Sequence, residues 1–154
     1  TFDGSAMIDE NNVLVNFEKG ETVLKGKCIT SMAEDENGNL YFSLYEFNPK
    51  DFKNRNEGIA VRYTDGTIKQ LTTENSGLPN NDTSEVLYDK NEKVLWISTI
   101  TAGLIRYDLN ESWENYHNLN SDIPTSFIST MTFDLDGNLL LATRQGLVKI
   151  EKKK

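Results

Sequence analysis

One phrase recurs three times in this chain of 154 residues. Each copy has a short apolar segment that ends in Asp, then a polar turn, then a longer apolar segment. The copies lie at residues 32–42, 86–99 and 131–143. The last two are 45 residues apart, measured from Asp89 to Asp134 or from Pro79 to Pro124. A repeat of this length predicts an array of similar structural units.

Each repeat contains segments with the properties of β-strands. They are short, rich in β-branched and aromatic residues, and bounded by Asn, Asp and Gly. A Gly with an apolar neighbour opens the third segment of each copy, at Gly58, Gly103 and Gly146. A fourth segment follows in two copies, at residues 67–71 and 113–116. Four strands in every ~40–50 residues is the period of a β-propeller blade.

The second strand of the repeat supports this fold class. Leu95–Ile97 and Leu139–Leu141 are apolar without interruption. A strand that is apolar on both sides must be covered on both faces, whereas a two-layer sandwich favours alternation. Blades of a propeller stack face to face and meet that condition. We therefore predict an all-β fold, a β-propeller segment of four-stranded antiparallel blades.

The copies are too few for an ordinary closed ring. Residues 4–9 and 13–17 parallel the third and fourth strands of a further copy. We expect about three to three and a half blades, and propellers close with typically four to eight. The chain starts at Thr1 rather than Met, which favours a processed or trimmed product. The expected partners are the remaining blades of a longer chain or further copies of this one. The predicted limits are a partial blade at 1–28, blades at 29–79 and 80–124, and a partial final blade at 125–154.

Composition excludes several classes of partner. Sixteen Lys and Arg stand against twenty-four Asp and Glu, which gives a formal net charge of −8. This charge argues against nucleic acid and against docking on an anionic membrane. No apolar run approaches the roughly 20 residues of a membrane span, so we expect no membrane contact by this segment. Cys28 is the single cysteine, so neither an intramolecular disulfide nor a cysteine-rich metal site is possible.

Few residues suggest catalysis. His117 is the single histidine and follows a predicted outermost strand, so we interpret it as a solvent-edge residue rather than a proton shuttle. The segments 35–39 and 134–138 resemble only the beginning of a calcium loop and suffice as hairpin turns. We assign Trp96 to the core between blades and Trp113 to packing or a rim. We therefore predict no catalytic residues, no metal and no cofactor.

The first copy departs from the repeat at one place. Its Asp35 precedes Asp89 by 54 residues, nine more than the spacing of the later copies. The extra residues predict a long loop at 45–57, on the face where second strands connect to third strands. That face mixes aromatic and polar groups suited to a carbohydrate or another small polar ligand. The alternative is a loop without a binding function. The candidate ligand-binding residues are Tyr45, Phe47, Phe52, Arg55, Thr101, Arg144 and Gln145.

The repeated residues resemble a known family, the two-component regulator propeller repeats. The resemblance lies in an Asp-turn-Leu-aromatic phrase, a following Gly-Leu and a Gly-Leu-Pro linker, and it runs from about Ile29 to the end. Three places depart from the family pattern, at Leu44, Lys93 and Asp122-Ile123. The matching segments are Asp35–Phe42, Gly77–Pro79, Leu95–Thr99, Gly103–Tyr107, Asp134–Thr143 and Gly146-Leu147.

The resemblance carries expectations about function. Family members typically form extracytoplasmic sensor portions, periplasmic or secreted, of bacterial hybrid two-component systems, and some sense glycan fragments. It therefore implies a non-catalytic ligand-recognition module in signal transduction. A propeller-type lyase or hydrolase is an alternative, similar to streptogramin lyases, which use a histidine and a magnesium ion. A protein-protein assembly scaffold is a further alternative.

Overall fold

A computed structural model describes residues 6–8, 11–12, 14–16, 23–48 and 53–152, and these form β-strands, turns and connections with no α-helix. The first two strands are β1 (Ala6–Ile8) and β2 (Leu14–Asn16). One four-stranded sheet contains β3 (Cys28–Glu34), β4 (Leu40–Asn48), β5 (Lys53–Arg62) and β6 (Ile68–Leu71). The next contains β7 (Thr83–Asp89), β8 (Val94–Thr99), β9 (Leu104–Tyr107) and β10 (Trp113–Tyr116). The last contains β11 (Ile128–Phe133), β12 (Leu139–Thr143) and β13 (Gly146–Ile150).

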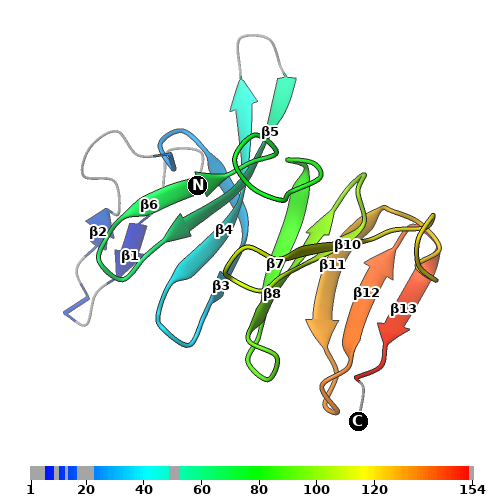
Figure 1. Cartoon of the computed structure of the whole chain (residues 1–154). Helices are drawn as coiled ribbons and strands as arrows, with labels where there is room; N and C mark the ends of the chain where they lie inside the picture. Colours follow the sequence, from blue (N-terminus) through cyan, green and yellow to red (C-terminus); the bar gives the residue numbers. More distant parts are fainter. Residues whose placement is uncertain (1–5, 9–10, 13, 17–22, 49–52, 153–154) are drawn as a thin grey trace.

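The three larger sheets confirm the predicted fold class. They are antiparallel meanders of four, four and three strands, and they follow one another across the molecule in chain order (Figure 1). The first strands of successive sheets are neighbours, because β3 contacts β7 and β7 contacts β11. No helix long and apolar enough to cross a membrane occurs in the described part of the chain. The blade limits given above remain a prediction.

The N-terminal residues form the expected strand pair. β1 and β2 are antiparallel, with Ala6 opposite Asn16 and Ile8 opposite Leu14. The connection between Ile8 and Leu14 has the same length as that between Tyr107 and Trp113 in the β9–β10 hairpin. That the pair is the third and fourth strands of a further blade stays a prediction.

The repeated Asp residues build the turn between first and second strands. The Asp35 carboxylate accepts hydrogen bonds from the backbone N–H groups of Asn37 (2.8 Å) and Asn39 (2.9 Å) and from the Tyr41 hydroxyl (3.0 Å). Gly38 supplies the positive φ of the turn, 81°. In the second copy Lys93 adopts a φ of 56° without a glycine. The Asp of each copy thus stabilises a hairpin.

The Asp turns make the unfolding free energy depend on pH in the acid range. Burial alone would raise the pKa of Asp35, but hydrogen bonds from Asn39, Asn37 and Tyr41 hold it below the usual 3.8. The stabilisation is therefore complete above pH 3.8 and is lost as the pH falls through the folded pKa. We expect Asp35→Asn to flatten the fall of unfolding free energy below about pH 4. Urea denaturation at several pH values measures this, and parallel wild-type and variant curves would contradict it.

Apolar side chains between adjacent sheets form the core. All six residues of β8 are buried, because one side of β8 packs on the first four-stranded sheet and the other on the last sheet. Leu95 and Ile97 join the first cluster, while Trp96, 8% exposed, joins the second. The assignment of Trp96 to the core between sheets is confirmed.

Trp113 has a packing role that depends on a glycine. Its ring stacks on Tyr107, with centroids 3.9 Å apart and an interplanar angle of 11°. It also covers Gly77, where an added Cβ would lie 2.3 Å from the Trp113 Cγ. The linker between the first two larger sheets therefore needs a residue without a side chain at this point.

We expect Gly77→Ala to lower the unfolding free energy by about 1–3 kcal/mol, because the new methyl group overlaps the Trp113 ring. Chemical denaturation measures the change. The matched control is Asp122→Ala in the next linker, which adds no Cβ and should be nearly neutral. Equal stabilities of Gly77→Ala and the wild type would contradict the proposed overlap.

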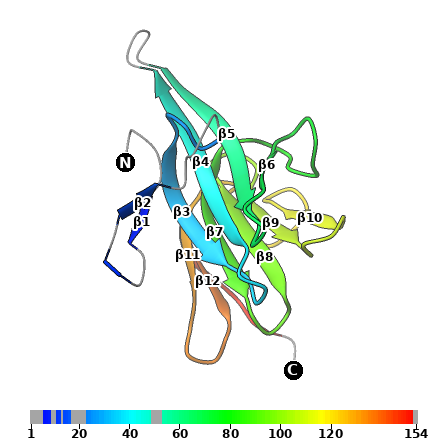
Figure 2. The same ribbon diagram turned by 90° about the vertical axis from the view of Figure 1, so that its left-hand side faces the viewer.

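The predicted long loop at residues 45–57 is wrong as to structure. Residues 45–48 continue β4 and residues 53–57 belong to β5, with Tyr45 opposite Asn56 and Asn48 opposite Lys53. A register shift between Ser43 and Tyr45 separates this extension from the rest of the sheet. The paired ends project beyond the other strands (Figures 1 and 2). Pairing satisfies backbone groups that a loop would leave to solvent.

Candidate functional site

The connections from second to third strands share one face with the linkers between sheets. The Gly58 N–H donates to the Asn81 carbonyl and the Gly103 N–H to the Ser126 carbonyl, each at 3.0 Å. The Ile100 N–H donates to the Asp82 carbonyl at 3.1 Å. We call this surface the connection face; it comprises residues 45–48, 53–57, 80–82, 99–103, 125–127 and 143–146.

Thr101 belongs to a polar cluster on the connection face. Its hydroxyl donates to the Asp82 carboxylate and accepts from the Asn80 side-chain amide at 2.8 Å. Asp82 is only 4% exposed, and its Oδ1 has no hydrogen-bond partner among the described residues. Buried polar atoms normally have partners, so a donor that reached this oxygen would be stabilised.

Arg144 lies in a second group on the same face. Its guanidinium carbon is 4.1 Å from the centroid of the Phe127 ring, a cation–π contact. Gln145 is the next residue of the turn, and its backbone N–H donates to the Thr143 hydroxyl at 3.1 Å. The contacts thus hold Arg144 against the linker and leave the Gln145 side chain exposed.

The hairpin extension carries the other predicted residues. Tyr45 is half-buried and lies opposite Cys28 in the sheet. Phe47 is on β4 and Arg55 on β5, whereas Phe52 lies outside the described residues. That these four residues form one site stays a prediction.

An ion cluster fixes the base of this extension. The Lys27 ammonium is 2.9 Å from Glu46 and 3.1 Å from Glu57. Burial would lower the pKa of Lys27, but hydrogen bonds and charges from the two glutamates raise it above its ordinary value. The Gln70 amide also donates to the Glu57 carboxylate at 3.1 Å. These contacts anchor the two projecting strands on the sheet.

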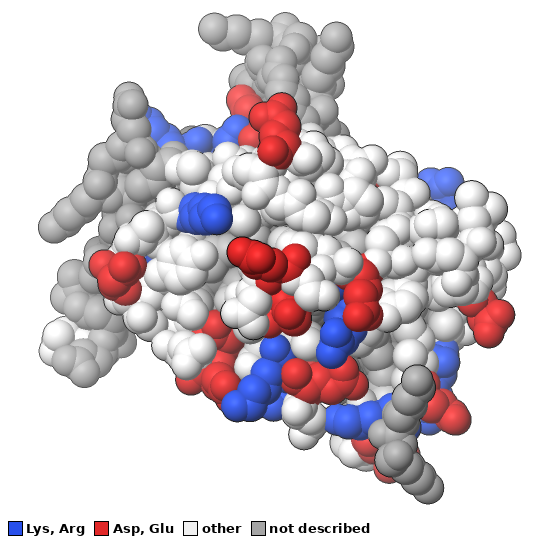
Figure 3. Space-filling view, in the orientation of Figure 1, with Lys and Arg blue, Asp and Glu red and all other residues white. Residues whose placement is uncertain are grey.

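A groove that the sequence reasoning missed lies at the far ends of the strands, near the Asp turns. This inter-sheet groove opens between the β7–β10 and β11–β13 sheets and encloses about 420 Å³. Its lining is Asp89, Glu92, Trp96, Arg106, Glu114, Tyr116, Phe133, Gly137, Leu139, Ile150, Glu151 and Lys152. Charged side chains of both signs gather on the lower part of the visible surface (Figure 3).

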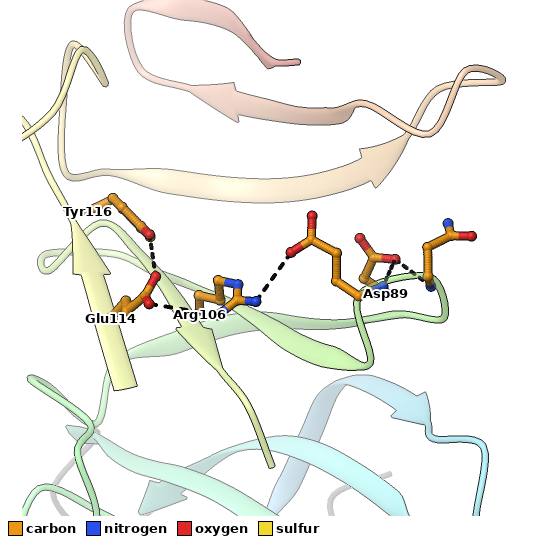
Figure 4. Close-up of polar contacts among 6 residues, drawn as sticks. Asp89, Arg106, Glu114 and Tyr116 are labelled. Carbon is orange, nitrogen blue, oxygen red and sulfur yellow. Dashed lines mark hydrogen bonds and ion pairs between the residues drawn. The ribbon is translucent and has the colours of Figure 1, made fainter. Parts of the chain in front are cut away.

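Arg106 organises the polar side of the inter-sheet groove. Its guanidinium nitrogens lie 3.3 Å from Glu92 and 3.7 Å from Glu114 (Figure 4). The Tyr116 hydroxyl donates to Glu114, and burial together with this hydrogen bond raises the pKa of Tyr116 to about 12. Tyr116 therefore stays a neutral donor across the physiological pH range.

The preceding interface has a smaller version of this groove. That cavity encloses about 280 Å³, and Val61 and Tyr41 are in its lining. Val61 precedes Arg106 by one repeat. Tyr41 is equivalent to Trp96, because Tyr41 pairs with Val61 in its sheet and Trp96 pairs with Arg106. The Tyr41 hydroxyl is paired with Asp35, whereas the buried Trp96 Nε1 has no partner among the described residues. A charge in the third strand where the earlier copy has Val61 is the signal that could have revealed the groove.

The sequence offered His117 for acid-base chemistry and the acidic turns for metal binding. No group of three or more His, Cys, Asp or Glu side chains there could hold a metal ion. The His117 Nδ1 accepts a hydrogen bond from the Leu119 backbone N–H at 3.2 Å. His117 thus helps to shape the linker that follows β10.

The chain is similar in fold to extracellular domains of bacterial sensors. It aligns with the extracellular domain of BT3049 from B. thetaiotaomicron, assigned to a hybrid two-component system, with a TM-score of 0.76 and 16% identity. It aligns with that of BT4673 from the same organism, assigned to a one-component system, with a TM-score of 0.71 and 16% identity. These alignments cover 98% and 100% of this chain but only 19% and 20% of theirs.

An enzyme has a similar fold. The chain aligns with an inactive H270A variant of virginiamycin B lyase from Staphylococcus aureus, solved with quinupristin, with a TM-score of 0.63 and 15% identity. That alignment covers 99% of this chain and 50% of the lyase. No protein-family model and no curated protein matches the chain. At these identities the likeness establishes the fold, part of a propeller-containing structure, and no activity.

We expect Arg106→Val to lower the unfolding free energy by less than about 1 kcal/mol, because its ion pairs are partly exposed. The loss should shrink in high salt, which screens such pairs. Urea denaturation at low and high salt measures both effects. A large, salt-independent loss would show instead that Arg106 acts mainly by packing.

Proposed function

We propose that this chain is part of a non-catalytic ligand-recognition propeller of a bacterial extracytoplasmic signalling protein. The likeness to extracellular domains of bacterial sensor systems supports this proposal, as does the resemblance of its repeats to two-component regulator propellers. The chain spans about a fifth of those two structures. We therefore assign signal transmission to other parts of the signalling protein.

The observation that carries the proposal is the polar cluster of the connection face. The buried Asp82 carboxylate, which has one unpaired oxygen, accepts from the Thr101 hydroxyl and so holds it beside the Asn80 amide. Arg144 adds a cation held on an aromatic ring. Carboxylates, amides and hydroxyls placed together bind hydroxyl-rich molecules through several directed hydrogen bonds. The ligand class that fits best is a carbohydrate.

All the residues predicted from the sequence are assigned to ligand binding in the proposed site. Thr101 and Arg144 contact the ligand directly, with Gln145 beside them. Tyr45, Phe47 and Arg55, on the strands of the projecting hairpin, and Phe52 would bind the more distant part of an extended oligosaccharide.

A test uses isothermal titration of a panel of oligosaccharides. For a sugar that binds, we expect Thr101→Val and Arg144→Ala each to weaken binding about tenfold, the cost of a lost hydrogen bond to a charged or buried group. Thr101→Ser should retain binding, because the hydroxyl remains. Lys69→Ala, which removes an exposed cation from β6, is the control. Wild-type affinity in both test variants would contradict this site.

The lyase fold match favours one alternative, a propeller-type lyase or hydrolase. In this chain it would depend on His117, whose Nδ1 already accepts a backbone hydrogen bond. Turnover of quinupristin that requires magnesium and disappears in His117→Ala would support the enzyme and overturn the proposal. A pure assembly scaffold, the other alternative, would bind no sugar in the titration.

The chain also fits a place within a larger propeller, either beside further blades or beside other copies of itself. Large apolar side chains are exposed on it, with Leu147 at 72% and Met32 at 70%. Exposed apolar area favours association. We therefore expect the isolated chain to self-associate in light scattering, and a stable, well-folded monomer would contradict this.

A further inference from the structure

The Asp that opens the turn between first and second strands has two carboxylate oxygens, and the second of them has different partners in the three copies. In the first copy, Asp35 Oδ2 accepts a hydrogen bond from the Asn39 side-chain amide at 2.8 Å and another from the Tyr41 hydroxyl at 3.0 Å. The second oxygen of this turn is therefore paired within the chain.

The third copy pairs the same oxygen with a cation. Asp134 Oδ2 accepts a hydrogen bond from the Asn138 side-chain amide at 2.9 Å and lies 3.1 Å from the Lys149 ammonium. An ammonium group thus fits beside the second oxygen of a turn of this kind, at hydrogen-bonding distance.

The second copy leaves the corresponding oxygen unpaired. Asp89 Oδ1 accepts from the backbone N–H groups of Asn91 at 2.8 Å and Glu92 at 3.2 Å, but Oδ2 has neither a hydrogen-bond nor an ion-pair partner among the described residues. Asp89 is 4% exposed, and Figure 4 shows this oxygen directed toward the β11–β13 sheet. A carboxylate as buried as this normally has a partner for its charge.

Two replacements in the sequence remove the donors that the first copy uses. Lys93 stands four residues after the turn Asp, where the first copy has Asn39, and its ammonium pairs with Glu36 of the neighbouring hairpin at 2.8 Å. Trp96 stands at the position of Tyr41 and has no hydroxyl to donate. Asp89 Oδ2 therefore loses both of the partners that its first-copy equivalent has.

The cation that the third copy uses is also redirected. Arg106 has the register position of Lys149, since following the cross-strand pairs from either residue leads to the first strand, two residues before its turn Asp. Arg106, however, pairs with Glu92 and Glu114. The place beside Asp89 that an ammonium takes in the third copy is thus open to an ammonium from another molecule.

The inter-sheet groove gives access to this place, because Asp89 is in its lining. Its volume of about 420 Å³ lies within the roughly 300–1,000 Å³ of small-molecule sites. Acidic side chains outnumber basic ones, and such an excess attracts cations. The charged lining residues are Asp89, Glu92, Glu114 and Glu151 against Arg106 and Lys152.

Aromatic rings from both sheets add to the attraction for a cation. Trp96 on β8, Tyr116 on β10 and Phe133 on β11 all line the inter-sheet groove. The face of an aromatic ring attracts a positive charge, and Leu139 and Ile150 supply apolar surface beside the rings. This lining suits an organic cation with an apolar body.

We propose that the inter-sheet groove binds a small organic molecule that carries a protonated primary amine. The ammonium group donates to Asp89 Oδ2, as the Lys149 ammonium does to Asp134, and the apolar body of the ligand lies against Phe133 and Ile150. The groove and the connection face lie at opposite ends of the strands, so the proposal is independent of the sugar site.

The test compares 2-phenylethylamine with 2-phenylethanol, which has a similar shape and a hydroxyl donor but no charge. Each is titrated to millimolar concentration into the isotope-labelled chain in an amine-free phosphate buffer. The backbone amide signals of Asn91 and Glu92 report on the turn of Asp89. The indole N–H signal of Trp96 reports on the groove, and that of Trp113, which is outside the groove lining, is the internal reference.

We expect the wild-type chain to bind the amine about tenfold more tightly than the alcohol, as a hydrogen bond between charged groups allows. Asp89→Asn should bind the two probes equally, because the variant keeps the Oδ1 acceptor of the turn and loses the charge. The matched control is Asp35→Asn, the same change in the first copy, which should retain the tenfold preference.

Three results would overturn the proposal. In the first, the amine shifts none of the reporter signals, or the wild-type chain binds amine and alcohol equally; this comparison needs no variant. In the second, Asp89→Asn keeps the preference for the amine. In the third, the signals of Asn91 and Glu92 shift with protein concentration alone, which would assign the site to a lysine of a second copy. Near-ultraviolet circular dichroism confirms that each variant is folded.

Discussion

Face-to-face burial of neighbouring sheets is the constraint on which the rest of this structure depends. β8 is buried along its whole length because a sheet covers each of its sides. Neither four-stranded sheet could bury both faces alone, so stability arises at the interfaces, as in other repeat architectures. Among the described residues, the last sheet takes part in one such interface, and Leu147 of β13 is largely exposed.

The features that the sequence predicted are those that every copy shares. The Asp turns, the apolar second strand and the Gly that opens the third strand recur, and each has one physical cause that periodicity reveals. The extension at residues 45–57 was predicted as a loop because it interrupts the period. Its pairing depends on Tyr45 meeting Asn56 across the hairpin, which an insertion count does not indicate.

The inter-sheet groove was missed for a different reason. It forms from side chains of two sheets that are distant in sequence, Arg106 and Tyr116 on one side and Phe133 and Ile150 on the other. Predicting it needs the register of both sheets and the cross-interface packing, and neither follows from a single repeat. Thr101 was predicted, but its buried partner Asp82 was not, because a linker Asp is usually solvated.

Differences between equivalent positions separate scaffold from site in this chain. One repeat later, Arg106 occupies the position equivalent to Val61, and Asp122 occupies the position equivalent to Gly77. The surrounding turns keep their geometry. A charge costs stability at an interface unless something pairs with it. Arg106 is paired within the chain, and no ion pair of Asp122 occurs among the described residues. The charge of Arg106 is therefore compensated within the chain, whereas Asp122 avoids that cost because it is exposed to solvent.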